Sequence, residues 1–366
     1  RYISVTGVQT CALPIFFVFN GGNQDLVEVG DVVTVRGTAG ENQGQTQVSS
    51  SAANIAVCGT GTVAPTEATL PVASATTFER YEGMLVKMAQ TLTVTEHFQL
   101  GRFGQVVLSS GGRLQQPTSV TTPGAAANAL QAQNDLNRLI VDDGSQAQNP
   151  DPIVFGRNGQ PLSAENTLRG GDTTTDPVGV MTYTWAGNSA SGNAYRLRPV
   201  GALDGTIVFE GTNPRPTSPP AVGGDVRVVG MNLLNYFNTF DGLPDTVDNC
   251  RLGTAGAATD CRGADTQAEF DRQWPKTVAA IKAMNPDVVG VNEIENDGYG
   301  SDSAIADLVG KLNAEMGAGT YAFIDADVAT GQVDALGTDA IKVGQIYKPA
   351  KVTPVGKTAV LNSTEF

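Results

Sequence analysis

Two polar residues stand at the ends of two short apolar runs, and their types suit a metal ion. Asn232 ends a run that begins at Val226, and Glu293 follows a run that begins at Val288. Runs of Val and Met bounded by Gly or Pro are typical of buried strands in a layered α/β domain. An amide and a carboxylate at the ends of neighbouring strands can share one hard cation, because Mg²⁺ and Ca²⁺ prefer oxygen ligands. Two polar strand ends that face solvent would give the same pattern.

The segment between these runs predicts a helix. Apolar residues from Phe270 to Ile281 recur at spacings of four, four and three residues, which places them on one helical face. Pro275 lies inside this pattern and predicts either a kink or two abutting helices. A strand, a helix and a strand in this order predict a parallel strand pair with a right-handed crossover.

These segments resemble the first half of a known hydrolase superfamily. Four pieces match in order, at residues 231–237, 261–265, 288–296 and 337–349. They are similar to the endonuclease/exonuclease/phosphatase superfamily, which has the DNase I fold, and more narrowly to secreted bacterial nucleases of the ExeM/NucH type. The resemblance implies hydrolysis of phosphodiesters with Mg²⁺ (or Mn²⁺ or Ca²⁺), carried out in a four-layer α/β sandwich.

The same resemblance implies roles for particular residues. Glu293 would ligate the metal, Asn232 would orient the metal or the phosphate, and both would be catalytic. Asp339 and Lys342 match positions near the rim of the cleft, without a defined role. Family members also carry a general-base histidine, a Gly-Asp-Phe-Asn block and a Ser-Asp-His block downstream. This sequence contains neither block, and we expect His97, its one histidine, to be structural. The chain is therefore expected to be a nuclease fragment that is inactive as it stands.

Cys250 and Cys261 flank a Gly- and Ala-rich insert with little apolar content. In a compartment that permits disulfides, a bond between them would close this loop. Free thiols or half of a metal site are alternatives, but no Cys-x-x-Cys pattern or nearby histidine supports zinc. We predict the disulfide, which leaves Cys58 without an obvious mate. Together with the resemblance, the predicted disulfide favours a secreted protein, extracellular or periplasmic.

The length of the chain allows two domains, since 366 residues exceed the roughly 250–300 at which single cores stop growing. Residues 1–15 resemble a translated sequencing adapter and are expected to be an artefact. Residues 16–205 contain short alternating runs between turns, which predict an all-β region, a sandwich or OB-like barrel. Residues 206–224 are rich in proline and predict a linker. Residues 225–366 are then the partial nuclease domain.

DNA, and alternatively RNA, is the substrate that the resemblance implies, and OB-like barrels often bind nucleic acid. Five residues of the first region could contact backbone and bases, although solvated strand-edge arginines are the interpretation that we favour. They are Arg80, Arg102, Phe103, Arg113 and Arg138. The net charge of −14 argues against a broadly basic surface, but a nuclease can meet phosphate through bound cations. The sequence has no run of 18 or more apolar residues, so it predicts no membrane span. We expect a monomer.

Two other functions fit the same sequence. The fold could act on another phosphoester, such as a nucleotide or a phospholipid head group. The scaffold could also serve a non-enzymatic protein that binds nucleic acid or a surface.

Overall fold

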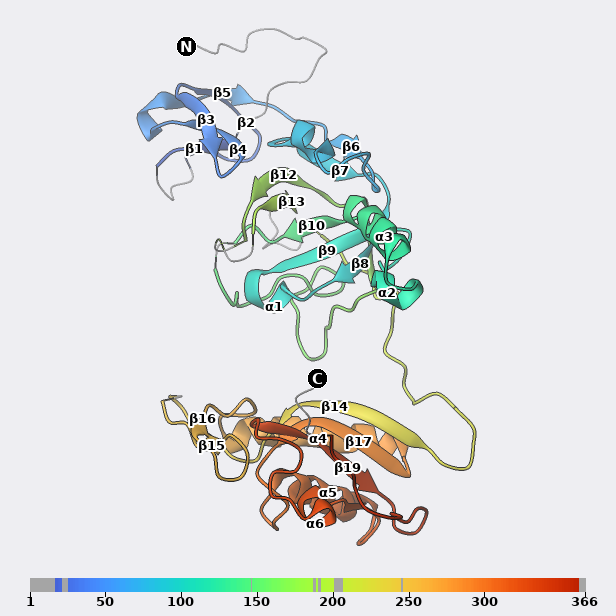
Figure 1. Cartoon of the computed structure of the whole chain (residues 1–366). Helices are drawn as coiled ribbons and strands as arrows, with labels where there is room; N and C mark the ends of the chain where they lie inside the picture. The colour runs from blue at the N-terminus through green and yellow to red at the C-terminus, as the bar shows by residue number, and fades with distance from the viewer. Residues whose placement is uncertain are drawn as a thin grey trace. The chain divides into compact units, whose positions relative to one another are not determined.

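The computed structural model describes most of the chain. The described residues are 17–21, 26–145, 147–186, 189, 192–200, 207–244 and 246–361. Residues 1–15, the predicted artefact, lie outside these ranges. The chain divides into two compact units, Arg1–Arg215 and Pro216–Phe366, and Figure 1 shows their elements. The division falls within residues 206–224, the stretch with the linker composition.

The first unit is rich in short strands. Its described strands are β1 (Phe17–Phe19), β2 (Asp31–Val35), β3 (Thr38–Asn42), β4 (Gln45–Ser49), β5 (Ile55–Thr60), β6 (Thr66–Ala68), β7 (Leu85–Met88), β8 (Thr91–Glu96), β9 (Gln105–Ser110), β10 (Leu139–Asp142), β11 (Thr173–Thr175), β12 (Val178–Thr184) and β13 (Ala194–Arg198). Its described helical segments are η1 (Ala52–Asn54), η2 (Thr77–Tyr81), α1 (Leu100–Phe103), α2 (Pro117–Val120) and α3 (Ala125–Leu136).

Eight of these strands form one curled half-barrel sheet, in the order β11-β8-β9-β10-β13-β12-β7-β6. Alternation in the sequence explains the packing: in β8, Leu92 and Val94 are buried while their neighbours Thr91 and Thr93 are more exposed. Separate small sheets join β1, β4 and β3, and β2 with β5. The apolar core of the unit lies against the eight-stranded sheet.

The prediction that this first region is all-β is wrong, because the unit also contains helices. The longest, α3, runs through Ala125–Leu136 and buries only Ala127 among its residues. Its sequence is rich in helix-forming Ala, Gln and Leu, but it lacks the apolar stripe that marks an amphipathic helix. The chain as a whole is a mixed α/β protein with several sheets.

The second unit combines strands and helices. Its described strands are β14 (Val228–Tyr236), β15 (Cys250–Arg251), β16 (Ala258–Thr259), β17 (Val288–Glu295), β18 (Ala322–Phe323) and β19 (Ile341–Tyr347). Its described helices are α4 (Gln267–Met284), α5 (Ala304–Met316) and α6 (Ala326–Thr330). Four strands form a sheet in the order β14-β17-β19-β18, with β14 parallel to β17 as the strand–helix–strand pattern predicts.

Helix α4 begins with side-chain caps that resemble a capping box. The Thr266 hydroxyl accepts the Glu269 N–H, and the Glu269 carboxylate accepts the Asp265 N–H. The helix continues as one element through Pro275, so the alternative of two abutting helices is wrong. Pro275 and Asp271 are both exposed, so the Asp271 carbonyl that loses its helical partner faces solvent.

Helices α4 and α5 pack on one face of this sheet (Figure 1). Ile281 of α4 and Leu308 of α5 are fully buried against Val289 and Val291 of β17. On the opposite face, among the described residues, Val228 is 69% exposed and other apolar side chains are also open. The helices therefore cover one face of the sheet that carries the candidate metal ligands.

Candidate active site

The two strands that carry Asn232 and Glu293 are interrupted at the same level. Asn232 lies opposite Asn292, but the next matched pair is Tyr236 with Ile294. Three residues of β14 therefore face one residue of β17, Glu293. Such a bulge breaks the alternation of side chains and re-aims them, and bulges are common beside active sites.

Three residues in this bulge have left-handed backbone conformations. Leu234 has φ 53°, Asn235 has φ 59° and Glu293 has φ 57°. Asn adopts this region readily, whereas Leu and Glu do so at a cost of roughly 1–3 kcal/mol each. The surrounding structure therefore has to hold them, and side-chain hydrogen bonds hold Leu234 and Asn235.

Asn232 and Gln273 make these hydrogen bonds. The Asn232 Oδ1 accepts the Leu234 N–H at 2.7 Å. The Gln273 Nε2, on α4, donates to the carbonyl oxygens of Leu234 and Asn235, both at 3.2 Å. The helix and the bulge are thus joined by a side chain that the sequence motifs do not single out.

The Glu293 carboxylate is available for a ligand. In a regular strand Glu293 would alternate with exposed Asn292 and point to the same side as buried Val291. Instead it lies in the bulge and is partly exposed. Within the described ranges, no hydrogen bond or ion pair joins its carboxylate to another residue. Asn232 is also exposed, so both predicted ligands reach the surface near one another in the strand register.

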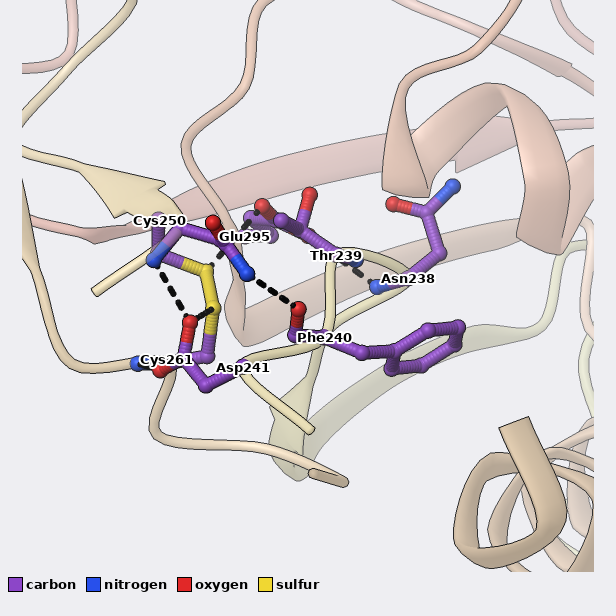
Figure 2. The surroundings of a disulfide bond; sticks show 8 residues. Asn238, Thr239, Phe240, Asp241, Cys250, Cys261 and Glu295 are labelled. Atoms are coloured by element: carbon purple, nitrogen blue, oxygen red, sulfur yellow. Dashed lines mark hydrogen bonds between the residues drawn. A yellow bond between two sulfur atoms is a disulfide. The ribbon is translucent and has the colours of Figure 1, made fainter. Parts of the chain in front are cut away.

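The second acidic residue of this strand, Glu295, has a structural role. One of its carboxylate oxygens accepts the N–H groups of Asn238 at 3.0 Å and Thr239 at 3.1 Å. Glu295 is buried and its other oxygen lies 3.5 Å from the Cys250 Sγ (Figure 2). It therefore fastens the chain that follows β14 to the end of β17.

Cys250 and Cys261 form the predicted disulfide, with their Cα atoms 5.1 Å apart. Asp241, labelled in Figure 2, accepts the Cys261 N–H at 2.5 Å. It also accepts the Asn249 N–H at 2.6 Å. The disulfide sulfurs carry no proton, so their approaches to Glu295 and Asp241 are contacts rather than hydrogen bonds. The bond closes the insert directly beside the strand ends.

Cys58 is a free, exposed thiol in the described part of the chain. It lies on β5 of the first unit. It takes no part in the bonded pair of the second unit.

Lys342, which was predicted to lie near the rim of the cleft, is buried. Its side chain is only 1% exposed. The Nζ donates to the Gly298 carbonyl and lies 4.1 Å from the centre of the Tyr299 ring. Burial lowers the pKa of Lys342, and the charge of Asp297 opposes that effect. The alternation of β19 places this residue on the helix-covered side of the sheet.

Asp297 is an acidic residue that the sequence motifs leave unassigned. Burial, followed by the charge of Glu295, raises the pKa of Asp297 to about 7. Its Oδ2 accepts the Ala304 N–H at 2.7 Å, at the start of α5, while its Oδ1 has no hydrogen-bond partner in the described residues. The Lys342 Nζ lies 3.9 Å from that Oδ1. The sequence places three acidic residues, Glu293, Glu295 and Asp297, at alternate positions, and this spacing could have identified Asp297 as a candidate.

Asp339 is exposed and forms an ion pair with Arg262, with 3.0 Å between Oδ1 and the guanidinium. Arg262 in turn lines a shallow cavity of about 380 Å³ that is wide open to solvent. The residues lining it are Leu234, Asn235, Arg262, Gly263, Ala264, Asp265, Glu269 and Gln273. The cavity therefore borders the β14 bulge that faces Glu293. Asp339 does not line the cavity but pairs with Arg262, which does.

The residues present could hold a hydrated Mg²⁺ but not a closed metal cage. Within the described residues, no cluster of three or more His, Cys, Asp or Glu could hold an ion. Mg²⁺ keeps several waters and is often bound by one or two carboxylates together with substrate phosphates. Glu293 has a free carboxylate for this, and the Asn232 Oδ1 retains a second lone pair beside its bond to Leu234.

Four of the five residues considered for a nucleic-acid surface on the first unit are exposed, and Phe103 is buried. Phe103 is 5% exposed, so its ring is not open to stack on a base. The four exposed residues are Arg80, Arg102, Arg113 and Arg138. Phe98, which is 81% exposed in the turn after β8, is an aromatic side chain open to solvent. Its neighbour His97 is also exposed.

None of the helices in the described ranges has the length and apolar character needed to cross a bilayer. Comparison of the chain with protein-family models, curated proteins and solved structures finds no match. Function is therefore inferred from the sequence motifs and from the residues of the site.

Proposed function

We propose that the second unit carries the metal-binding part of a divalent-metal-dependent nuclease that hydrolyses DNA phosphodiester bonds. The observation that carries this proposal is Glu293, a partly exposed carboxylate without a protein partner in the described residues, held in a left-handed bulge opposite the β14 bulge. Backbone strain of this kind clusters at functional sites, where it orients a group for its ligand.

The chemistry requires a metal, an activated water and donors for the developing charge. A bound Mg²⁺ would polarise the phosphate and offset its negative charge. Glu293 would hold the ion. Asn232 accepts the Leu234 N–H through Oδ1, which fixes the orientation of the amide. Its Nδ2 is therefore left to donate to a phosphate oxygen.

In this proposal the first unit binds nucleic acid, and its curled sheet serves as the binding surface, as the barrel of an OB-fold does. Exposed Phe98 can stack on a base, and the exposed arginines can contact phosphates. The disulfide between Cys250 and Cys261 supports a secreted protein, extracellular or periplasmic, because such bonds persist in oxidising compartments.

The metal ligand can be tested without catalysis. Mn²⁺ binding, followed by water-proton relaxation, should weaken at least tenfold in Glu293→Gln, because the amide keeps the shape but removes the charge that a hard cation needs. Glu315→Gln is the control, since Glu315 is half exposed on α5 and pairs with Lys282. Equal Mn²⁺ binding by the parent and Glu293→Gln would refute the assignment.

Activity is tested on the product of the whole gene. Mg²⁺-dependent cleavage of plasmid DNA should be lost in Glu293→Gln and kept in Glu315→Gln. Hydrolysis of mononucleotides or phospholipid head groups, with DNA untouched, would favour the other phosphoester reaction. Nucleic-acid binding without any hydrolysis would favour a non-enzymatic role.

A further inference from the structure

Helix α4 contacts the β14 bulge through two side chains that lie one turn apart. The ring of Phe270 packs edge-on against the ring of Tyr236, with 5.2 Å between the ring centres, and Tyr236 is fully buried. The Gln273 Nε2 donates to the carbonyl oxygens of Leu234 and Asn235, both at 3.2 Å. The helix therefore holds the bulge at two points, an apolar contact where the bulge ends and a polar contact along its backbone.

The hydrogen bonds of Gln273 match the bulge in number and direction. Its amide nitrogen carries two hydrogens, and two consecutive carbonyl oxygens accept from it. The reversed amide would place its oxygen against both carbonyl oxygens, so the observed orientation is fixed. In this orientation the Oε1 is buried without a partner among the described residues. A buried acceptor without a partner is destabilising, so the fold keeps the two donated bonds at a cost.

The same bulge orients the side chain of Asn232. The Asn232 Oδ1 accepts the Leu234 N–H at 2.7 Å, which forms an Asx turn. Leu234 is therefore held on both sides of its Cα, by Asn232 at its N–H and by Gln273 at its carbonyl oxygen. Because its left-handed conformation is disfavoured for leucine, this residue depends on both bonds. Asn232 and Gln273 are thus linked through one strained residue.

We propose that Gln273 is a positioning residue of the metal site, which acts through Leu234 to orient the Asn232 amide. The inference rests on the proposed function, in which Asn232 orients the metal or the phosphate. Without the Gln273 bonds, Leu234 leaves its left-handed conformation more often, and Asn232 then loses the bond that fixes its amide. Gln273 itself does not contact the metal or the substrate.

Gln273→Met tests this link, because methionine has a similar length and helix propensity but no N–H donor. Mn²⁺ binding, followed by water-proton relaxation, should weaken about tenfold, the lower end of what loss of a group that orients a metal ligand costs. Exchange of the Leu234 amide hydrogen, followed by NMR in EDTA, should be faster than in the parent, because its bond to Asn232 opens more often. Gln273→Glu is a second variant of the same shape and should weaken Mn²⁺ binding at least as much, because an ionised carboxylate donates to neither carbonyl oxygen.

Gln267→Met is the matched control on the same helix. Gln267 is exposed, and its Nε2 donates to the Asp271 carboxylate rather than to the bulge. Mn²⁺ binding and Leu234 exchange should both equal those of the parent. A loss of binding as large as that in Gln273→Met would show that any glutamine of α4 has the same effect, and it would overturn the proposal.

A double-mutant cycle separates positioning from a general structural role. If Gln273 acts through Asn232, Gln273→Met should weaken Mn²⁺ binding about tenfold in the parent but less than about twofold in an Asn232→Ala background, because coupled residues are not additive. A merely structural role would give the same loss in both backgrounds and would overturn the proposal. Unchanged Mn²⁺ binding in Gln273→Met would overturn it as well.

The positioning role and the proposed function fail separately. If Glu293→Gln leaves Mn²⁺ binding unchanged, the proposed metal site fails, whereas Leu234 exchange in EDTA still reports whether Gln273 holds the Asn232 bond. If Glu293→Gln weakens Mn²⁺ binding but Gln273→Met does not, the metal site stands and the positioning role fails.

Discussion

Removal of the disulfide between Cys250 and Cys261 should destabilise the second unit by about 3 kcal/mol. The two cysteines are 11 residues apart, and the loss of chain entropy in the unfolded state for a loop of this length gives that magnitude. Both side chains are buried, so the double substitution Cys250→Ala with Cys261→Ala tests the bond without leaving a lone thiol. The loss should also loosen the segment that Glu295 fastens to β17.

Urea unfolding measures this change. For a urea dependence of about 1–3 kcal/mol per molar, a loss of about 3 kcal/mol lowers the midpoint by about 1–3 M. Hydrogen exchange of the peptide that covers β17, followed by mass spectrometry, reports the second unit alone. Cys58→Ala is the control and should stay within about 0.5 kcal/mol of the parent, because Cys58 is exposed and free.

Two results would refute this reasoning. A double variant within about 0.5 kcal/mol of the parent would show that the insert is ordered by its hydrogen bonds to Asp241 rather than by the covalent link. Free thiols at both positions, in unreduced peptides from protein purified from an oxidising compartment, would show that the bond does not form.

Three further predictions follow from other parts of the chain. Because burial raises the pKa of Asp297 to about 7, the folded state binds a proton that the unfolded state releases, so stability should fall as the pH rises from about 4 to 7; Asp297→Asn should flatten that part of a pH series of urea midpoints. Residues 16–366 should not cleave plasmid DNA with Mg²⁺, because the one histidine, His97, lies in the first unit; EDTA-sensitive cleavage would contradict this. Residues 16–211 should melt cooperatively, since the apolar core of the first unit lies within them, whereas residues 16–366 should aggregate more readily in light scattering through the exposed valines of β14 and β19; equal solubility would contradict the second part.

The sequence alone was sufficient for features that depend on local pattern. The parallel strand pair that carries Asn232 and Glu293 was predicted from local patterns. These were the apolar runs at β14 and β17 and the helical spacing of α4. The composition of the insert gave the pair Cys250 and Cys261. In each case residues close together in the sequence show the periodicity, or the lack of apolar residues that calls for a covalent link. Contacts between distant residues were therefore not needed for these predictions.

Local pattern failed where packing partners decide the outcome. Helix α3 lacks an apolar stripe, and the sequence did not predict the burial of Phe103 and Lys342. Burial depends on which elements cover a strand face, and that is settled by contacts between residues far apart in the sequence.

Only the tertiary structure showed how the site is formed. The bulge places Leu234 in a left-handed conformation that its sequence disfavours, and Gln273 from α4 holds the bulge in place. Asp297 and the cavity at Arg262 likewise arise from three-dimensional juxtaposition. Strain at one position can persist only when distant groups stabilise it, and the spacing of residues along a chain does not record those groups.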